Sequence, residues 1–189
     1  MPTIRPYLPT DQTSWLRCRV LSFLNTCYYD DVRRTRPHED DLVVSLVAAS
    51  GDEVVGLIDV TVDGSAATID CIAIHPDHQP HGLGARLFEA ALAELGSEVE
   101  TIDAWTREDE AANRWYRSRG FRENSRYLHV YKDWDESVDA FSTPEPLSTP
   151  VQAFMQAKIE HEAELRTRFR RVYVCRQYLK IICPEPSTP

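Results

Sequence analysis

The sequence lacks any apolar run approaching the roughly 20 residues that a membrane helix needs, and its N-terminus lacks the apolar core of a signal peptide. It also lacks an excess of positive charge, since 21 Lys and Arg face 30 Asp and Glu for a net charge of -9. General nucleic-acid binding needs cationic side chains that release counterions from phosphates. We therefore expect a cytoplasmic protein with no membrane and no nucleic-acid partner, whose acidic balance suits a cationic one.

The chain also lacks a CxxC pair, and its five cysteines are odd in number and widely scattered. Reduced thiols in a cytoplasmic protein explain this pattern best. The 189 residues, 42% hydrophobic and 27% charged, are enough for one globular domain with a sizeable core. The cysteines are Cys18, Cys27, Cys71, Cys175 and Cys183.

Alternating helical and β-branched patterns predict a mixed α/β domain. A short apolar start at Thr3–Tyr7 precedes a helical pattern that Thr10-Asp11 can cap. Three Val- and Ile-rich runs separated by short turns then indicate an antiparallel meander, whose third run should be central and buried. The runs are Leu42–Ala49, Glu53–Val62 and Ala67–His75; a helix from Leu83, a strand at Glu100–Trp105, a helix at Glu108–Arg119 and a strand at Phe121–Lys132 follow.

The C-terminal part has a different composition. Ser142–Pro150 is a proline-punctuated linker, and the tail at 184–189 nearly repeats it. Between them we predict a charged helix at about Val151–Arg170, whose apolar face could dock a second copy of the chain, and a strand at Val172–Ile182. We expect a single domain over 1–189, with an insertion at about 137–171 before a last strand at 172–182 and a flexible tail at 184–189.

The stretch from His75 to Leu87 carries three histidines and two glycines. His75, His78 and His81 are spaced for a metal, but prolines break any helix that would stack them and no fourth ligand flanks them, so we expect no metal. An ordinary strand-to-helix turn remains an alternative. The order of buried strand, glycine loop and helix start favours phosphate binding, because a helix N-terminus offers unpaired N–H groups and a positive dipole end. Neither GxGxxG nor GxxxxGK[ST] is present.

Two blocks carry a family resemblance. The first is Gln79-x-x-Gly82-x-Gly84 after the strand, and the second is Asp109-x-x-Ala112-x-x-Trp115-Tyr116-x-x-x-Gly120-Phe121. Together they resemble the two cofactor segments of the GCN5-related N-acetyltransferase (GNAT) family, over about residues 3–133. The resemblance implies the GNAT fold: an α/β structure with a mixed, mostly antiparallel central sheet, flanked by helices and splayed at its middle strands.

The resemblance also implies acetyl-CoA as co-substrate and a set of residues that bind it. Backbone groups on the central strand would pair with the pantetheine arm, and the glycine turn would wrap the pyrophosphate. Asp109 departs from the family's usual Asn, and a carboxylate cannot donate the amide's hydrogen bond, although it can cap a helix. The implied cofactor-binding residues are Ile72, Ala73, Ile74, Gln79, Pro80, His81, Gly82, Leu83, Gly84, Ala85, Asp109, Ala112 and Tyr116.

The resemblance places the Tyr116 hydroxyl near the thioester sulfur, where a phenol with an ordinary pKa of about 10 could protonate the departing thiolate. The base is less defined. Some family members use a Glu at the position of Thr68, and alternation puts Asp70 on the same face, where burial would raise its pKa. Asp59, Asp103 or a water chain are the alternatives.

We therefore expect an acetyl-CoA-dependent N-acetyltransferase that moves the acetyl group to a primary amine of a small molecule or peptide by direct attack. The alternative is a non-catalytic acyl-CoA sensor of the same fold. His129, on a late strand, either walls the acceptor pocket or is a hydrogen-bonded sheet histidine.

Overall fold

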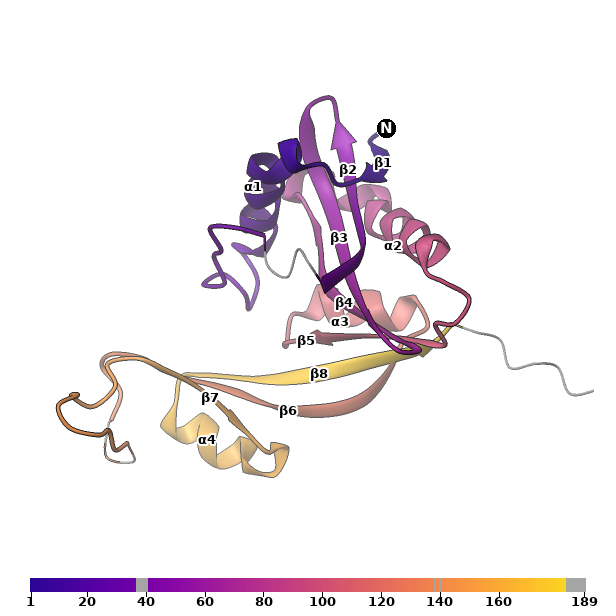
Figure 1. Cartoon of the computed structure of the whole chain (residues 1–189). Coiled ribbons are helices and arrows are strands. Elements are labelled where there is room, and N and C mark those ends of the chain that lie inside the picture. Colours follow the sequence, from indigo (N-terminus) through magenta and orange to yellow (C-terminus); the bar gives the residue numbers. More distant parts are fainter. Residues whose placement is uncertain (37–40, 138, 140, 183–189) are drawn as a thin grey trace, which may run out of the picture.

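A computed structural model describes residues 1–36, 41–137, 139 and 141–182. Its elements follow the predicted order, with one more strand near the C-terminus (Figure 1). They are β1 Thr3–Pro6, η1 Pro9–Asp11, α1 Gln12–Phe23, β2 Leu42–Ser50, β3 Glu53–Asp63, β4 Ala66–Ile74, η3 Pro76–His81, α2 Leu83–Glu94, β5 Thr101–Thr106, α3 Glu110–Ser118, β6 Arg122–Lys132, β7 Ala153–Ala157, η4 Ile159–His161, α4 Glu162–Arg168 and β8 Arg171–Ile181.

The strands of the described residues form one eight-stranded sheet in the order β1-β2-β3-β4-β5-β8-β6-β7. Neighbours are antiparallel except β4 and β5, which are parallel and pair only from Ala66/Thr101 to Thr68/Asp103. Beyond that last pair the two strands separate, so the sheet opens at its middle. We call this opening the splay. The predicted fold class, a mostly antiparallel sheet splayed at its middle strands, is confirmed.

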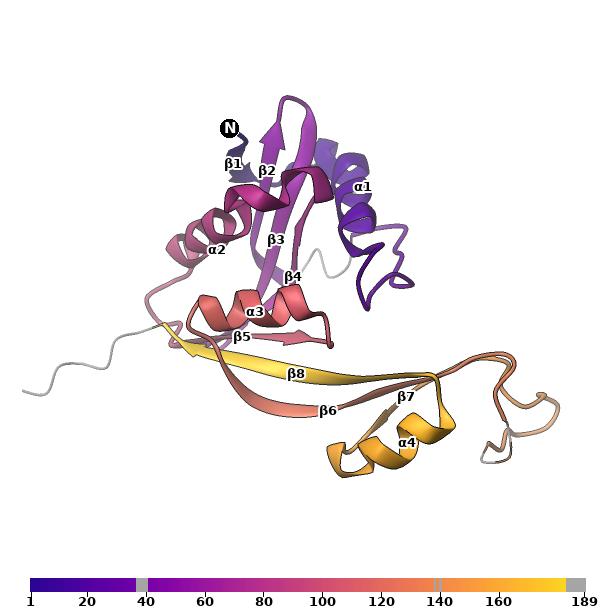
Figure 2. The same ribbon diagram turned by 180° about the vertical axis from the view of Figure 1, so that it is seen from behind.

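Helices cover both faces of the sheet (Figures 1 and 2). On one face, α1 buries Trp15 and Cys18 against Leu57, Cys71 and Ala73. On the other, α2 and α3 pack on the larger core, where Leu87, Phe88 and Tyr116 contact apolar side chains of β2 to β5 and β8. Alternation along each strand produces these two apolar faces.

A β-bulge interrupts this alternation in β4. Val60 pairs with Ile69 and Asp59 pairs with Cys71, which leaves Asp70 as the extra residue. Ile69 therefore belongs to the core under α2 and α3, whereas Cys71 belongs to the cluster under α1. The expectation that Asp70 is buried is wrong, because its side chain is exposed at the bulge.

The predicted helix at Val151–Arg170 is also wrong over its first half. Residues 153–157 form β7, which pairs with β6, and the α-helix covers only Glu162–Arg168. The strand that follows, β8, lies between β5 and β6. We call the outer part of the sheet the arm: 127–132 of β6, β7, η4, α4 and 171–175 of β8. Figure 2 shows it extending beyond the other strands.

The arm has a small apolar core of its own, so most of the face proposed to dock a second copy is already covered. Met155, Ile159 and Leu165 pack against it, and its buried members are Leu128, Val130, Phe169, Val172 and Val174. The predicted tail at 184–189 lies outside the described residues. In the part of the chain that is described, no helix is long and apolar enough to cross a membrane.

Candidate active site

The splay exposes the backbone of β4 to the space left by β5. His75 donates its backbone N–H to Val55 at 2.9 Å, so His75 and Val55 form a hydrogen-bonded pair of the antiparallel ladder. Hydrogen-bonded and non-bonded pairs alternate, so Ala73 also bonds towards β3, whereas Ile72 and Ile74 direct their backbone groups towards β5. Two of the three backbone positions expected to meet pantetheine thus face the splay.

The turn after β4 presents the start of α2. His75 precedes η3, and Gly82 ends that turn with φ 67° and ψ 14°, a left-handed conformation that suits glycine. The first backbone bond of α2 runs from the Arg86 N–H to the Gly82 carbonyl at 3.2 Å. The N–H groups of the three residues between them have no acceptor within the helix, as at any helix start. Gln79 lies on the same turn, where its Nε2 donates to the Ile74 carbonyl at 3.3 Å.

The two glycines of the first motif have different surroundings. A Cβ built on Gly82 would meet no atom within 4 Å, so that position faces open space. A Cβ on Gly84 would lie 3.5 Å from Trp115 Nε1 and 3.7 Å from Ile74 Cγ1, which are ordinary contacts. A methyl group at Gly84 would therefore pack against α3 and β4 without displacing either. The side chains of Pro80 and His81 lie outside what the structure describes.

The second motif forms α3. Asp109 is the N-cap, and its carboxylate accepts the backbone N–H of Ala112 at 3.0 Å. The predicted capping role is therefore confirmed, and this oxygen is engaged by the chain itself. Acid at a helix N-terminus also interacts favourably with the helix dipole.

Tyr116 lies on the buried face of α3, and only 6% of its surface is exposed. Its ring stacks on Tyr178 of β8 with centroids 5.5 Å apart, and the Tyr178 hydroxyl donates to Asn113 Oδ1 at 2.9 Å. Burial raises the pKa of Tyr116 well above its usual value, and Tyr28, Cys71 and Asp103 raise that pKa further. The phenol is therefore protonated at neutral pH and lies near the splay.

The three carboxylates considered as base have distinct environments. Asp59 is 1% exposed, and its Oδ1 accepts from Arg36 Nη2 and from Ser45 Oγ, each at 2.6 Å. It serves a buried ion pair. Asp103 lies at the last β4–β5 pair, where it accepts from Thr68 Oγ1 at 2.6 Å and from Gln177 Nε2. Asp70, at the bulge, is the exposed one.

Two residues at the splay carried no signal in the sequence. The Arg107 backbone N–H donates to the Tyr28 hydroxyl at 3.0 Å, and Arg107 Nη1 donates to the Cys27 carbonyl at 2.5 Å. Burial raises the pKa of Tyr28 to about 12. These contacts join the segment after α1 to the end of β5. Because they link positions 79 and 80 residues apart, no local pattern indicates them.

His129 is a hydrogen-bonded sheet histidine, the second of its two predicted roles. Its Nδ1 accepts from Arg107 Nε at 3.2 Å, and its Nε2 lies 2.9 Å from the Tyr127 hydroxyl, so a neutral ring carries its hydrogen on Nε2. Burial, followed by the charge of Arg107, lowers its pKa to about 4. The ring is hydrogen-bonded within the sheet and lies on the face that bears Asp103.

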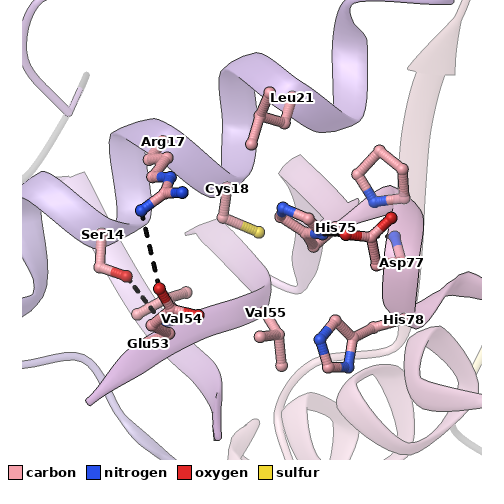
Figure 3. A pocket seen from close by; sticks show the side chains of 11 residues that line it. Ser14, Arg17, Cys18, Leu21, Glu53, Val54, Val55, His75, Asp77 and His78 are labelled. Carbon is pink, nitrogen blue, oxygen red and sulfur yellow. Dashed lines mark hydrogen bonds and ion pairs between the residues drawn. The ribbon is translucent and has the colours of Figure 1, made fainter.

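A cavity lies away from the splay. It measures about 390 Å³ and is bounded by α1, the start of β3 and η3 (Figure 3). His75 and His78 line it with ring centroids 5.8 Å apart, beside Cys18, whose pKa burial raises to about 11. No group of three metal-type donors occurs among the described side chains. The cavity contains none of the residues predicted to bind the cofactor.

Comparisons with known proteins agree with this geometry. Residues 41–123 match the family model described as an acetyltransferase (GNAT) domain, and no curated protein matches the chain. Among solved structures, the ribosomal-protein-S18-alanine N-acetyltransferase of Escherichia coli has a TM-score of 0.61 at 16% identity, covering 100% of this chain and 99% of that one. NAA60 of Arabidopsis thaliana, solved with a bisubstrate analogue, has a TM-score of 0.61 at 13% identity, covering 96% and 98%. These likenesses show that the chain has the GNAT fold, and residues 41–123 are similar in sequence to the acetyltransferase domain of that family.

Proposed function

We propose that the protein is an acetyl-CoA-dependent N-acetyltransferase that acetylates a primary amine by direct attack. The observation that carries this proposal is the splay, because it combines three elements that such a reaction needs. Backbone groups of Ile72 and Ile74 face it, the α2 N-terminus opens beside it, and the protonated phenol of Tyr116 lies near it.

In this mechanism the pantetheine arm lies in the splay and the diphosphate lies on the N–H groups at the start of α2. The amine nitrogen attacks the thioester carbonyl, the carbon–sulfur bond breaks, and Tyr116 gives its proton to the departing thiolate. The nitrogen's proton passes to a base. We assign this role to Asp70, because its side chain is exposed two residues beyond the last β4–β5 pair, whereas Asp59 is buried and held by Arg36. Holding two substrates together supplies much of the rate gain.

Thiol release from acetyl-CoA with a panel of amines tests the proposal. Tyr116→Phe should lower kcat by about 100-fold or more, the usual share of a general acid, and leave the KM for acetyl-CoA unchanged. Tyr28→Phe tests the other phenol near the splay, and Tyr29→Phe, on a side chain that is 45% exposed, is the control. An unchanged rate in Tyr116→Phe would remove that residue from the mechanism. Calorimetric binding of acetyl-CoA without release by any amine would instead favour the sensor.

Asp70→Asn and Asp103→Asn distinguish the two carboxylates nearest the splay as candidates for the base. If Asp70 is the base, its amide variant loses the acidic limb of the pH profile of kcat/KM, whereas Asp103→Asn keeps that limb. The reverse result would assign the base to Asp103.

A further inference from the structure

The face of the sheet that bears Asp103 carries a row of aromatic side chains leading away from the splay. Each ring contacts the next, with centroids 4.9 to 6.0 Å apart. We call this row the aromatic strip, and it consists, in order, of Trp105, Tyr127, His129, Phe154, Tyr131 and Tyr173.

The register of the strands explains why these rings share one face. In β5, Ile102 and Ala104 are buried in the core under α2 and α3, so Trp105 points to the opposite face with Asp103. In β6, Leu128 and Val130 face the core of the arm, so the odd-numbered residues from Tyr127 to Tyr131 point the other way. Tyr131 pairs directly with Phe154 of β7.

The strip is only partly open to solvent: Tyr127, His129, Tyr131 and Tyr173 are half-buried, and the guanidinium groups of Arg107 and Arg171 lie over the Tyr131 ring, 5.3 and 4.2 Å from its centroid. Trp105 is 39% exposed and Phe154 is 52% exposed. Two exposed rings joined by a continuous row of half-buried rings on one face are typical of a binding surface. Polar edges interrupt the strip, because Tyr127 and His129 share a hydrogen bond and Gln156 lies beside Tyr127 with its Nε2 3.5 Å from the hydroxyl.

We propose that the aromatic strip binds the acceptor, and that the acceptor is an extended peptide whose terminal amine lies at the splay and whose next side chains, apolar or aromatic, lie on the rings. This rests on the proposed acetyl transfer. The strip begins at Trp105, two residues beyond Asp103, so it continues directly from the place where the amine must lie. The carboxylates of Asp70 and Asp103 complement an ammonium group there.

The length of the strip selects a peptide over a small amine. From Tyr127 to Tyr131 the rings follow β6 over about 13 Å, at about 3.3 Å a residue. An extended peptide covers that length with about four residues. A small aromatic amine would contact only the first ring or two and leave Phe154 in water.

The position of the strip also favours the N-terminus of a peptide over an internal lysine as the acceptor of the acetyl group. The strip leaves the splay in one direction only, towards the arm. On the opposite side, the same face of β3 carries the buried Arg36–Asp59 pair rather than open apolar surface. A peptide that is acetylated at its N-terminus continues from the amine in one direction, so it needs apolar surface on one side of the splay only. The inserted strand β7 thus gains a role, since it supplies Phe154.

The test compares KM and kcat for acceptors that differ in length and character. They are a hexapeptide amide with a free N-terminus and aromatic second and fourth residues, its serine-substituted counterpart, tryptamine and spermidine. We expect the aromatic hexapeptide to have a KM at least about tenfold lower than the others, the effect of about 1.4 kcal/mol. Phe154→Ser should raise that KM about fivefold or more and leave kcat within twofold.

Trp134→Ser is the matched control, since Trp134 is an aromatic residue beside the arm that is 73% exposed and outside the strip. Its KM should equal that of the parent. Equal use of tryptamine and the hexapeptide, or a KM that Phe154→Ser leaves unchanged, would overturn the assignment. If no amine is acetylated, the proposed function fails on its own. Calorimetric titration of the CoA-saturated protein with the hexapeptide then tests whether the strip binds a peptide. Binding that is weakened by Phe154→Ser supports this assignment, and absence of binding refutes it.

Discussion

The two glycines of the first motif should respond differently to the same substitution, because they serve different needs. Gly82 has φ 67°, a backbone conformation that costs an L-residue about 1–2 kcal/mol, and a methyl group there would meet no atom within 4 Å. Gly82→Ala should therefore lower the free energy of unfolding by about 1–2 kcal/mol through backbone strain alone. For a chain of this size each kcal/mol corresponds to about 2–4 °C, so the melting temperature should fall by about 2–8 °C.

Gly84→Ala should not lower stability. Gly84 is the second residue of α2, where alanine is the better helix former by up to about 1 kcal/mol, and its methyl group would contact Trp115 and Ile74 at ordinary distances. Since that methyl group points into the protein, the variant should also bind acetyl-CoA as the parent does. Thermal unfolding followed by circular dichroism and binding followed by calorimetry measure both quantities.

A third variant separates strain from bulk. Asparagine tolerates the left-handed conformation, so Gly82→Asn should recover most of the stability that alanine loses while adding a larger side chain. If Gly82→Ala and Gly82→Asn bind acetyl-CoA equally weakly, open space at this position is what the cofactor needs. The reasoning is refuted if Gly82→Ala melts at the parent temperature, or if Gly84→Ala is the variant that loses stability or affinity.

The sequence predicted most of the sheet because its strands are marked locally. The runs that became β2, β3 and β4 are rich in β-branched residues and are separated by turns at Gly51 and Gly64, both with positive φ. The cofactor segments were also local, since each combines a glycine turn or a cap with the helix that follows. Tyr116 could therefore be singled out from the second segment, and the structure places it on the buried face of α3.

Features that depend on pairing between distant strands were not predictable in the same way. In residues 151–170 the apolar positions fit a helical spacing, and only the free edge of β6, more than twenty residues earlier, makes 153–157 a strand. The position of Asp70 is set by the bulge against β3, which alternation along β4 alone cannot reveal. The aromatic strip combines both cases, because it needs the register of four strands.

Three further predictions concern the network around the site. Asp59→Ala should lower the free energy of unfolding by about 3–5 kcal/mol, because it leaves the buried guanidinium of Arg36 without its partner, and the urea midpoint measures this. Asn113→Ala should lower the free energy of unfolding by about 2 kcal/mol or more, because it removes the hydrogen-bond acceptor of the Tyr178 hydroxyl. It should also lower kcat, because the ring of Tyr116 stacks on Tyr178. A kcat equal to that of the parent would show that this stacking does not orient the Tyr116 phenol. For His129 the folded pKa of about 4 lies below the ordinary 6.5, so on acidification the unfolded chain takes up this proton first. Stability relative to His129→Gln should therefore be retained above pH 6.5 and fall as the pH drops towards about 4. Because burial and the charge of Arg107 both lower this pKa, parallel stability curves for the two proteins over this range would mean that His129 is not buried beside Arg107 in solution.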